Sequence, residues 1–440
     1  MASDLIKCPL EECLDALIDY RGKTPKKVSS GVPLITAKVV KSGRIEPPTE
    51  FIAEGDYAAW MTRGYPEVGD IVLTTEAPLG EVAQIKYLPV ALAQRIVTLR
   101  GKEGILDNNY LLYLLQSSQM QEKLIGRSTG TTVVGIKQSE LRKVEVTLPP
   151  MEEQRAIAHI LSTIDDKIEL NRQTNKTLEE MAHSLFKAWF VDFEPVRAKM
   201  NGSWLRGQSL PGLPAHFYDL FPNNLVKSEW GDIPEGWNYS TIGEQVTVCG
   251  GATPSTKKAE FWENGNHCWA TPKDLSPLKF PILLNTNRKI TDSGLAKISS
   301  GLLPIGTVLL SSRAPIGYLA IAEVPTAINQ GFIAMKCDGY LPNVFVLLWC
   351  RENMDAIISN ANGSTFQEIS KSNFRPIPVI VPPQPILDNF KSLSNSFYQL
   401  LVENEKESHY LSQLRDTLLP KLISGELRIE NAKHIGGAAL

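Results

Sequence analysis

Two segments of the chain repeat apolar residues at alternating spacings of four and three positions. The first series is broken near its centre by Asn171 and Asn175, and the second by Asn404 at the position equivalent to Asn171. Heptad seams of this kind predict two long helices that pack as a coiled coil, whose register the asparagines set. Helices of roughly 35–40 residues would extend about 55–60 Å. The apolar members are Ile157, Leu161, Ile164, Ile168, Leu178, Ala182, Leu185 and Trp189, then Phe390, Phe397, Leu401, Leu411, Leu418 and Leu422.

Outside these helices the sequence repeats itself. GDIVLTTEAPLG at residues 69–80 matches GTVLLSSRAPIG at residues 306–317, and the Leu-Pro-Pro of 148–150 matches the Val-Pro-Pro of 381–383. Short β-rich runs between glycines and prolines predict mixed α/β units, with helices near 108–124 and 342–359. The repeat therefore predicts the order globular unit, helix, globular unit, helix.

The predicted fold class is α+β. Two mixed α/β domains alternate with two long helices that form an antiparallel intramolecular coiled coil, in a pseudo-two-fold tandem repeat. The helices are expected to be antiparallel because the chain termini then come together. The predicted domains are residues 1–148, the first helix region 149–200, a linker with the second domain 201–381, the second helix region 382–427 and a tail 428–440.

An aromatic stretch ends the first helix. Residues 185–193, LFKAWFVDF, are apolar on more than one face, and two helices cannot bury all of them. Either the second globular unit or a partner protein must cover the remainder. We expect a partner to dock on Phe186, Trp189, Phe190 and Phe193.

Composition excludes several classes of protein. Of 440 residues, 43% are hydrophobic and 21% charged, which is typical of a folded chain and not of a disordered tail. No apolar run approaches the ~18 residues that a membrane span needs, and the first residues do not have the pattern of a secretory signal. Six cysteines without a Cys-x-x-Cys pair favour a reducing cytoplasm and indicate neither a disulfide framework nor a zinc ribbon.

The formal net charge of −3 argues at first against a nucleic-acid binder. The mean conceals a local excess, because residues 21–44 contain seven basic side chains and no acidic one. Such a run is either a solvated loop or a face that contacts phosphates, and the charges alone leave both open. Its members are Arg21, Lys23, Lys26, Lys27, Lys38, Lys41 and Arg44.

Known catalytic motifs do not occur in the sequence. The proline pairs lack the flanking residues with which an amino-methyltransferase holds an extruded base. Gly22-Lys23-Thr24 lacks the first glycine of a phosphate loop, the six histidines lack metal-ligand spacing, and there is no Gly-x-Ser-x-Gly elbow. We therefore expect no active site and no metal on this chain.

Four motifs in order resemble the specificity subunits of type I restriction-modification enzymes. LPPMEEQR at 148–155 enters the first helix, and WFVDFEPVRAKM at 189–200 ends it. EWGDIPEGW at 229–237 enters the second domain, and LLPKLISGEL at 418–427 closes the second helix. One departure is the start of the second helix, PQPILD at 383–388, which lacks Glu-Glu-Gln.

The resemblance implies a DNA-binding chain without catalytic activity or cofactor. Each domain would be a target recognition domain that reads half of a bipartite site in the major groove of double-stranded DNA, with the helices as a ruler. Two modification subunits would bind S-adenosylmethionine and methylate adenine at N6, and restriction subunits would use ATP and Mg. The setting would be the cytoplasm of a bacterium or archaeon. A stand-alone, single-chain DNA-binding regulator and a protein-only scaffold remain as alternatives.

Base readout needs polar side chains that reach the base edges. Positions shared by the two domains, such as Lys38 and Lys273, would hold phosphates or structure, because sequence reading must differ between domains. In the first domain the candidates are Arg21, Lys23, Thr24, Lys26, Lys27, Lys38, Arg63, Gln94, Arg95, Arg127, Thr131 and Thr132. In the second they are Thr253, Ser255, Lys257, Lys258, Lys273, Ser312, Arg313, Asn329, Gln330, Thr365 and Gln367.

Overall fold

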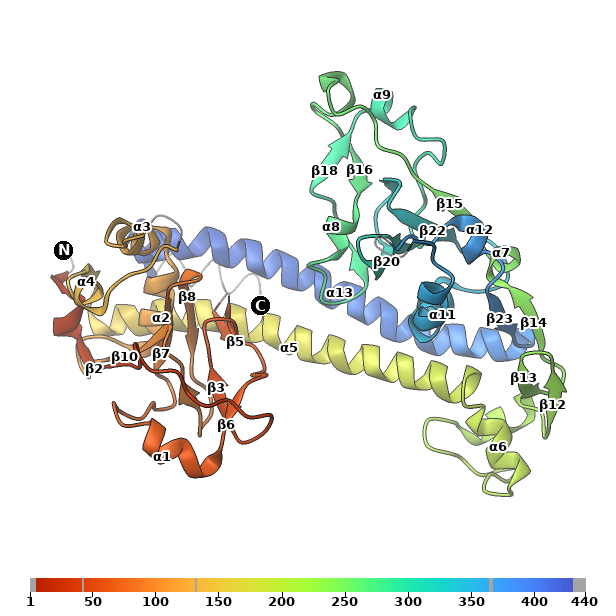
Figure 1. Ribbon diagram of the computed structural model, residues 1–440, viewed down its shortest axis with the longest axis horizontal. Coiled ribbons are helices and arrows are strands. Elements are labelled where there is room, and N and C mark those ends of the chain that lie inside the picture. The colour runs from red at the N-terminus through yellow and green to blue at the C-terminus, as the bar shows by residue number, and fades with distance from the viewer. Residues whose placement is uncertain (1–4, 42, 131–132, 364–366, 430–440) are drawn as a thin grey trace. The chain divides into compact units, whose positions relative to one another are not determined.

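The computed structural model describes residues 5–41, 43–130, 133–363 and 367–429 (Figure 1). The chain divides into two compact units, each of which combines one α/β domain with part of each long helix. Unit 1 comprises Met1–Glu169 and His409–Leu440, and unit 2 comprises Leu170–Ser408.

The domain of unit 1 is built on a four-stranded antiparallel sheet in the order β2-β10-β7-β8. A three-stranded sheet, β6-β3-β9, and the pairs β1-β11 and β4-β5 complete its strands. Their bounds are β1 Ile6–Pro9, β2 Leu14–Asp19, β3 Val32–Ile35, β4 Val40–Lys41, β5 Arg44–Ile45, β6 Phe51–Ile52, β7 Ile71–Thr75, β8 Leu79–Gln84, β9 Ala91–Leu92, β10 Ile96–Gly101 and β11 Glu145–Leu148. The helices are η1 Leu10–Cys13, η2 Glu54–Asp56, α1 Tyr57–Trp60, α2 Asn108–Gln116, α3 Ser118–Gly126 and α4 Gln138–Arg142.

Both faces of the four-stranded sheet of unit 1 are buried, and successive side chains along a strand point to opposite faces. In β7, Ile71 and Leu73 join the core beneath α2, α3 and the long helices, whereas Val72 joins the core shared with the three-stranded sheet. The helix predicted near 108–124 is two helices, because the chain turns at Ser117. The hydroxyl of this serine accepts a hydrogen bond from the Met120 amide and caps α3.

The domain of unit 2 repeats this topology with one more strand, β17, at the edge of its main sheet. Its main sheet has the order β15-β22-β19-β20-β17, and β18-β16-β21 and β14-β23 correspond to β6-β3-β9 and β1-β11. The strand bounds are β12 Leu225–Ser228, β13 Gly231–Pro234, β14 Asn238–Thr241, β15 Thr247–Gly250, β16 His267–Ala270, β17 Ile282–Leu283, β18 Arg288–Ile290, β19 Val308–Ser312, β20 Ile316–Ala322, β21 Thr326–Ile328, β22 Phe332–Lys336 and β23 Pro378–Val381. The helices are α6 Glu194–Met200, η3 Ala215–Leu220, α7 Ile242–Gln245, η4 Ala259–Phe261, α8 Pro272–Leu275, α9 Asp292–Leu295, α10 Asn343–Glu352, α11 Met354–Ser359 and α12 Lys371–Phe374. The predicted helix near 342–359 is thus α10 followed by α11.

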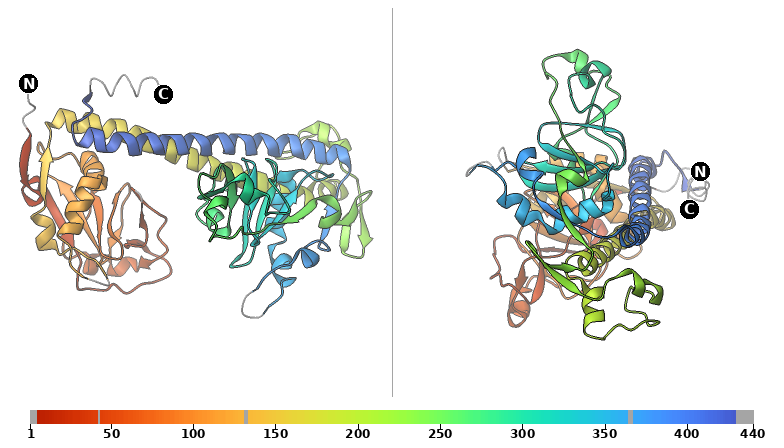
Figure 2. Two further views of the ribbon diagram at one scale, coloured as in Figure 1. Left: turned by 90° about the horizontal axis from the view of Figure 1, so that it is seen from above. Right: turned by 90° about the vertical axis from the view of Figure 1, so that its right-hand side faces the viewer.

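Two helices of 40 residues, α5 (Met151–Phe190) and α13 (Gln384–Ile423), correspond to the two heptad seams (Figure 2). They pack antiparallel, because the start of α5 contacts the end of α13 in unit 1 and the end of α5 contacts the start of α13 in unit 2. In unit 1, Arg415 Nη1 donates to Asp165 Oδ1 at 2.8 Å, and the Tyr113 hydroxyl of α2 donates to Asp165 Oδ2 at 2.9 Å. The predicted α+β tandem repeat with an antiparallel coiled coil is confirmed.

The three seam asparagines lie at the contact between the helices in unit 2. Asn171 and Asn175 are 3% and 0% exposed, so their amides need partners. Asn171 Nδ2 donates to Glu407 Oε2 at 2.7 Å, Asn175 Nδ2 to Glu405 Oε1 at 3.0 Å, and Asn404 Nδ2 to Asn175 Oδ1 at 2.8 Å. A shift of one helix along the other would separate these partners, so the bonds give a physical reason for the predicted register role.

This network makes the stability of unit 2 depend on pH. Burial raises the pKa of Glu405, and the hydrogen bond from Asn175 and the charge of Lys279 offset part of that rise. The ionised carboxylate is therefore less favourable in the folded chain than in the unfolded chain, and this cost disappears as pH falls through the folded pKa. We expect Glu405→Gln to raise the urea midpoint of unfolding at about pH 7.5 and to change it little at about pH 4. Equal changes at both pH values would contradict this prediction.

The aromatic stretch after α5 is covered by unit 2 itself, so the prediction that it docks a partner is wrong. Phe186, Trp189, Phe190 and Phe193 are between 1% and 7% exposed. Their rings meet others of unit 2: Phe190 packs edge-on against Phe390 at 4.9 Å between centroids, and Trp189 against Phe221 at 5.1 Å. Interlocked rings of this kind form a core and leave no free surface for another protein.

Part of the predicted linker is also core. Trp204, which follows α6, is fully buried, and Phe217 and Phe221 pack against Trp189. The Lys199 ammonium of α6 donates to the carbonyl of Tyr218 at 2.9 Å and lies over its ring. Proline and glycine in this segment give it irregular backbone, but its aromatic side chains belong to the second domain.

Candidate nucleic-acid interface

The predicted DNA-contacting loops carry the same polar contact in both domains. In unit 1, Gln94 Nε2 donates to Thr24 Oγ1 at 3.5 Å, and in unit 2 the Thr253 hydroxyl donates to Gln330 Oε1 at 2.6 Å. Each contact joins the loop after the first strand of the main sheet, β2 or β15, to the turn before the strand that pairs with it, β10 or β22. The repeat therefore extends to side chains, and it brings residues 70 and 77 positions apart to one surface of each domain.

The basic run of residues 21–44 is less charged than its sequence suggests. Three members are paired with acids: Lys27 with Glu50 at 2.8 Å, Lys41 with Glu46 at 3.1 Å and Arg44 with Glu169 at 3.2 Å. Lys23, Lys26 and Lys38 are exposed, and within the described residues no ion pair involves them. Only these three lysines are thus fully available to a phosphate group.

Two arginines of the first domain hold loops in place. Arg21 Nη2 donates to the carbonyl of Ile136 at 2.8 Å, and Arg63 Nη1 donates to the carbonyls of Asp19 and Arg21 at 2.9 Å each. A guanidinium that caps backbone carbonyls has fewer donors left for DNA. The structure thus assigns both residues a structural role that their sequence positions did not indicate.

Other candidates are tied to neighbouring acids or lie outside the described residues. Arg95 pairs with Glu76 at 3.2 Å, and Arg127 with Glu140 at 3.3 Å. In unit 2, Arg313 pairs with Glu368 at 3.5 Å, and Lys258 with Glu260 at 3.4 Å. Ser255, Lys257, Lys273 and Gln367 are exposed. Thr131, Thr132 and Thr365 fall outside the described residues.

Two candidates of the second domain have structural roles. Ser312 is 3% exposed, its amide donates to the Gly331 carbonyl at 2.8 Å and its carbonyl accepts from Ile369, so its prediction as a DNA contact is wrong. The Asn329 side chain accepts from the Gly331 amide at 2.9 Å and shapes the turn before β22. Thr75, the counterpart of Ser312, makes the same backbone bonds to Arg95 and Ile136 in unit 1.

The fold also places basic side chains that sequence reasoning missed beside these loops. The Lys371 ammonium lies 3.2 Å from where a Cβ on Gly250 would stand, next to the loop of Thr253. Arg288 of β18 lies over the Trp262 ring, 3.6 Å from its centroid. Neither residue belongs to a basic run or a repeated motif, so the sequence carried no signal for them.

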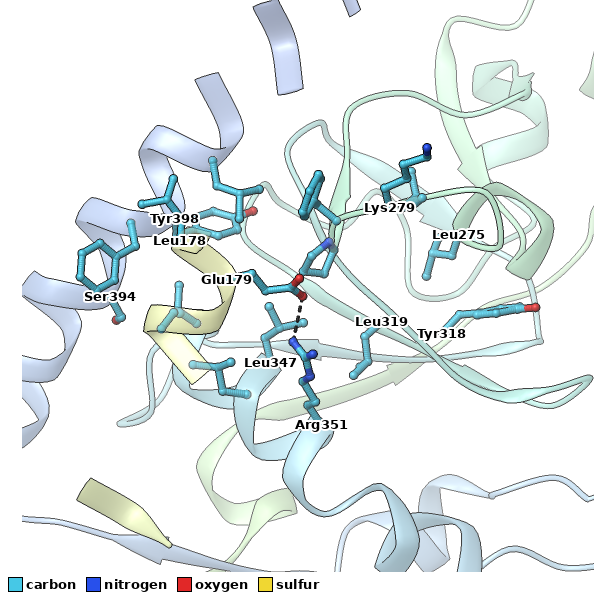
Figure 3. A pocket seen from close by; sticks show the side chains of 18 of the residues that line it. Leu178, Glu179, Leu275, Lys279, Tyr318, Leu319, Leu347, Arg351, Ser394 and Tyr398 are labelled. Atoms are coloured by element: carbon cyan, nitrogen blue, oxygen red, sulfur yellow. Dashed lines mark hydrogen bonds and ion pairs between the residues drawn. The ribbon is translucent and has the colours of Figure 1, made fainter. Parts of the chain in front are cut away.

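A pocket of about 410 Å³ in unit 2 is separate from these loops (Figure 3). It lies between α5, α13, α10 and the segment after α8, and the Arg351–Glu179 ion pair of 2.8 Å crosses it. None of the predicted DNA-contacting residues lines it.

The described residues contain no group of three or more potential metal ligands, and no helix among them has both the length and the apolar character to cross a membrane.

The glutamine of the first helix motif has a structural role. Gln154 is fully buried, its Nε2 donates to the carbonyls of Ile105 and Pro149, and its Oε1 accepts from the Asp107 amide. In the second copy the corresponding residue is Leu387, which is buried in the core of unit 2. Where the first helix has the Glu-Glu-Gln motif, its start is held by the hydrogen bonds of a buried glutamine. The second helix lacks the motif, and a buried leucine packs at the equivalent position instead.

Comparisons with known proteins agree with this architecture. A family model described as the type I restriction modification DNA specificity domain matches residues 21–180 and 234–421, one domain-plus-helix copy in each range. The specificity subunit of type I restriction enzyme MjaIX from Methanocaldococcus jannaschii is 30% identical over 368 residues, which cover 82% of this chain and 78% of that protein. The specificity subunit of HindI from Haemophilus influenzae is 26% identical over 380 residues, which cover 76% and 81%. The fold resembles the crystal structure of a type I S subunit from M. genitalium with a TM-score of 0.57 at 16% identity, over 96% of each chain. The chain, with its two copies of the specificity domain, therefore belongs to the family of type I restriction-modification specificity subunits.

Proposed function

We propose that this chain is the non-catalytic DNA-reading subunit of a type I restriction-modification complex. Its two domains read the two halves of a bipartite target in double-stranded DNA. The observation that carries this proposal is the paired polar contact, Thr24 with Gln94 and Thr253 with Gln330, in loops that share a Thr-Pro pair and differ at most other positions. A common frame with different flanking side chains suits two domains that meet the same backbone and read different bases.

The same proposal includes the partners. Two adenine-N6 methyltransferase subunits bind S-adenosylmethionine and supply the chemistry, and restriction subunits with ATP and Mg join them in the cytoplasm of a bacterium or archaeon. A surface that occurs twice in one chain suits a partner that docks twice. This docking surface excludes Phe186, Trp189, Phe190 and Phe193, since unit 2 buries them.

The test is methylation-site sequencing of DNA from cells that express the chain together with the methyltransferase subunit of the same organism. We expect methylated adenines within one bipartite motif, and no such motif when the chain is omitted. A gel shift with the chain alone separates the alternatives: a stand-alone regulator would bind the motif tightly without the methyltransferase. A scaffold that binds only protein would leave DNA unbound with or without it.

The phosphate-contacting role of the basic run gives a graded prediction. Lys23→Ala should weaken binding of the complex to all DNA sequences and lower the slope of log affinity against log salt by about one, because one counterion fewer is released. Lys27→Ala should do so less, because Glu50 already neutralises Lys27 at 2.8 Å. Fluorescence anisotropy over a salt series measures both slopes. If neither variant changes the slope, the run is a solvated loop and not a phosphate face.

A further inference from the structure

The two domains place opposite charges at one equivalent strand position. In unit 2, β18 pairs with β16, with Ile290 opposite His267 and Arg288 opposite Trp269. In unit 1, β6 pairs with β3, with Ile52 opposite Val32, and the carbonyl of Glu50 accepts a hydrogen bond from the Leu34 amide. Counted from the shared isoleucine, Glu50 is the counterpart of Arg288.

The surroundings of the two charges differ as well. The Glu50 carboxylate forms an ion pair with the ammonium of Lys27, so the two charges neutralise each other in unit 1. The Arg288 guanidinium lies 3.6 Å from the centroid of the Trp262 ring and 5.5 Å from that of Trp269. Its side chain is exposed, and the ion pairs found among the described residues do not include it. The second domain thus presents a positive charge where the first presents a neutral pair.

The tryptophan under Arg288 comes from extra sequence. Between the equivalent positions Pro25 and Lys38 the first domain has 12 residues, whereas between Pro254 and Lys273 the second has 18. The additional residues fall in the segment that carries Trp262. β16, β18 and α9 lie together in this part of the second domain (Figure 1).

Hydrogen bonds tie this stack to the predicted DNA-contacting loop. The Trp262 indole N–H donates to the Ser255 carbonyl at 3.0 Å, and that of Trp269 donates to the Ala252 carbonyl at 3.2 Å. Thr253, which contacts Gln330, lies between these two acceptors in the chain. Arg288 is therefore held beside the loop for which we propose DNA contact.

The geometry of the stack suits the recognition of a base. An indole face holds the guanidinium by a cation–π attraction and leaves the N–H groups at its edge free. The planar fork of donors matches O6 and N7 of guanine in the major groove. Since the stack orders the side chain before binding, less conformational entropy is lost on contact. Positions shared by the domains suit phosphates, whereas a position that differs in charge suits sequence reading.

We propose that Arg288, positioned by Trp262, reads a guanine in the half-site of the second domain. This inference rests on the proposed function. It makes the extra segment of that domain a determinant of specificity, and it predicts that the first domain cannot read a guanine in the same way, because Glu50 occupies the equivalent position.

The experiment uses the complex of the full chain with its methyltransferase subunit, and sequences the methylated sites for the wild type and for Arg288→Lys, Arg288→Ala and Lys289→Ala. Arg288→Lys keeps the charge and loses the planar fork. Both Arg288 variants should lower discrimination at one guanine of one half-site by about tenfold to a hundredfold and leave the other half-site unchanged. Lys289→Ala is the matched control, since its side chain is exposed and points to the opposite face of the same strand.

The outcomes are distinguishable. If the wild-type complex methylates no bipartite motif, the proposed function fails and the inference fails with it. If the wild-type motif is bipartite but both Arg288 variants keep it, the inference alone is overturned. The inference is also overturned if Arg288→Ala weakens binding to all DNA sequences without changing the motif, while Arg288→Lys keeps the wild-type affinity. That result identifies Arg288 as a phosphate contact. Circular dichroism and urea unfolding of each variant establish that the fold is intact.

Discussion

Trp189→Ala should lower the free energy of unfolding of unit 2 by about 3–5 kcal/mol, the usual cost of deleting a large aromatic side chain from a core. Trp189 is 1% exposed and contacts Phe190, Phe217, Phe221 and Phe390 through its ring. The alanine would leave a cavity that four rigid rings cannot close by small shifts. Urea unfolding of the full chain, followed by far-ultraviolet circular dichroism, measures the loss.

Val191 is a matched control for Trp189. It lies two residues further along the chain and is 41% exposed, so Val191→Ala should change the free energy of unfolding by no more than about 0.5 kcal/mol. A Trp189→Ala chain of wild-type stability that fails to bind the methyltransferase would contradict the structure. It would restore the interpretation of the aromatic stretch as a partner-docking surface.

Four alanines inserted into α5 after Lys167 should break the contact between the long helices. Before the insertion lies Asp165, which accepts Arg415 at 2.8 Å, and after it lies Asn171, which donates to Glu407 at 2.7 Å. The insertion adds about 6 Å and a rotation of about 40°, so an unaltered α13 cannot satisfy both contacts. Each buried polar group left without a partner costs about 1–3 kcal/mol.

A matched insertion separates stability from function. Four further alanines in α13 after Tyr410, between Glu407 and Arg415, should restore both contacts and the stability of the chain. Under the proposed function, the doubly extended chain should then prefer a bipartite motif whose spacer is longer by about two base pairs. Methylation-site sequencing of the single and double insertions measures this. If the double insertion folds and keeps the original spacer, the helices do not set the distance between half-sites.

The long helices and the repeat could be predicted because their signals are local or periodic. The seam of 157–189 repeats every heptad, and a helix is the one regular structure that gathers such positions on one side. The segments 69–80 and 306–317 align without a gap, and both form a hairpin of the main sheet, β7-β8 and β19-β20. The prediction that the aromatic stretch docks a partner is wrong, because its periodicity shows only that some other surface must cover it.

In the candidate interface, too, the repeated positions could be predicted from the sequence, whereas the charge pairing could not. The equivalence of Thr24 with Thr253 and of Gln94 with Gln330 followed from the repeat, and the structure brings each pair together. The sequence alone predicts a free charge at Lys27, because its partner Glu50 lies outside the basic run. Charge pairing joins residues with no fixed separation along the chain, so no sequence pattern reports it.

The sequence by itself determined the tandem order, the two long helices, the membership of the family and the absence of familiar catalytic motifs. Each of these depends on patterns that are complete within a few dozen residues. Only the tertiary structure decided which side chains remain free. It buried the aromatic stretch in unit 2, placed Ser312 inside a sheet and set Arg288 on Trp262. Burial and charge pairing depend on contacts between segments that are far apart in the chain. The energy of each contact depends on a distance of a few ångströms, and no local pattern in the sequence determines that distance.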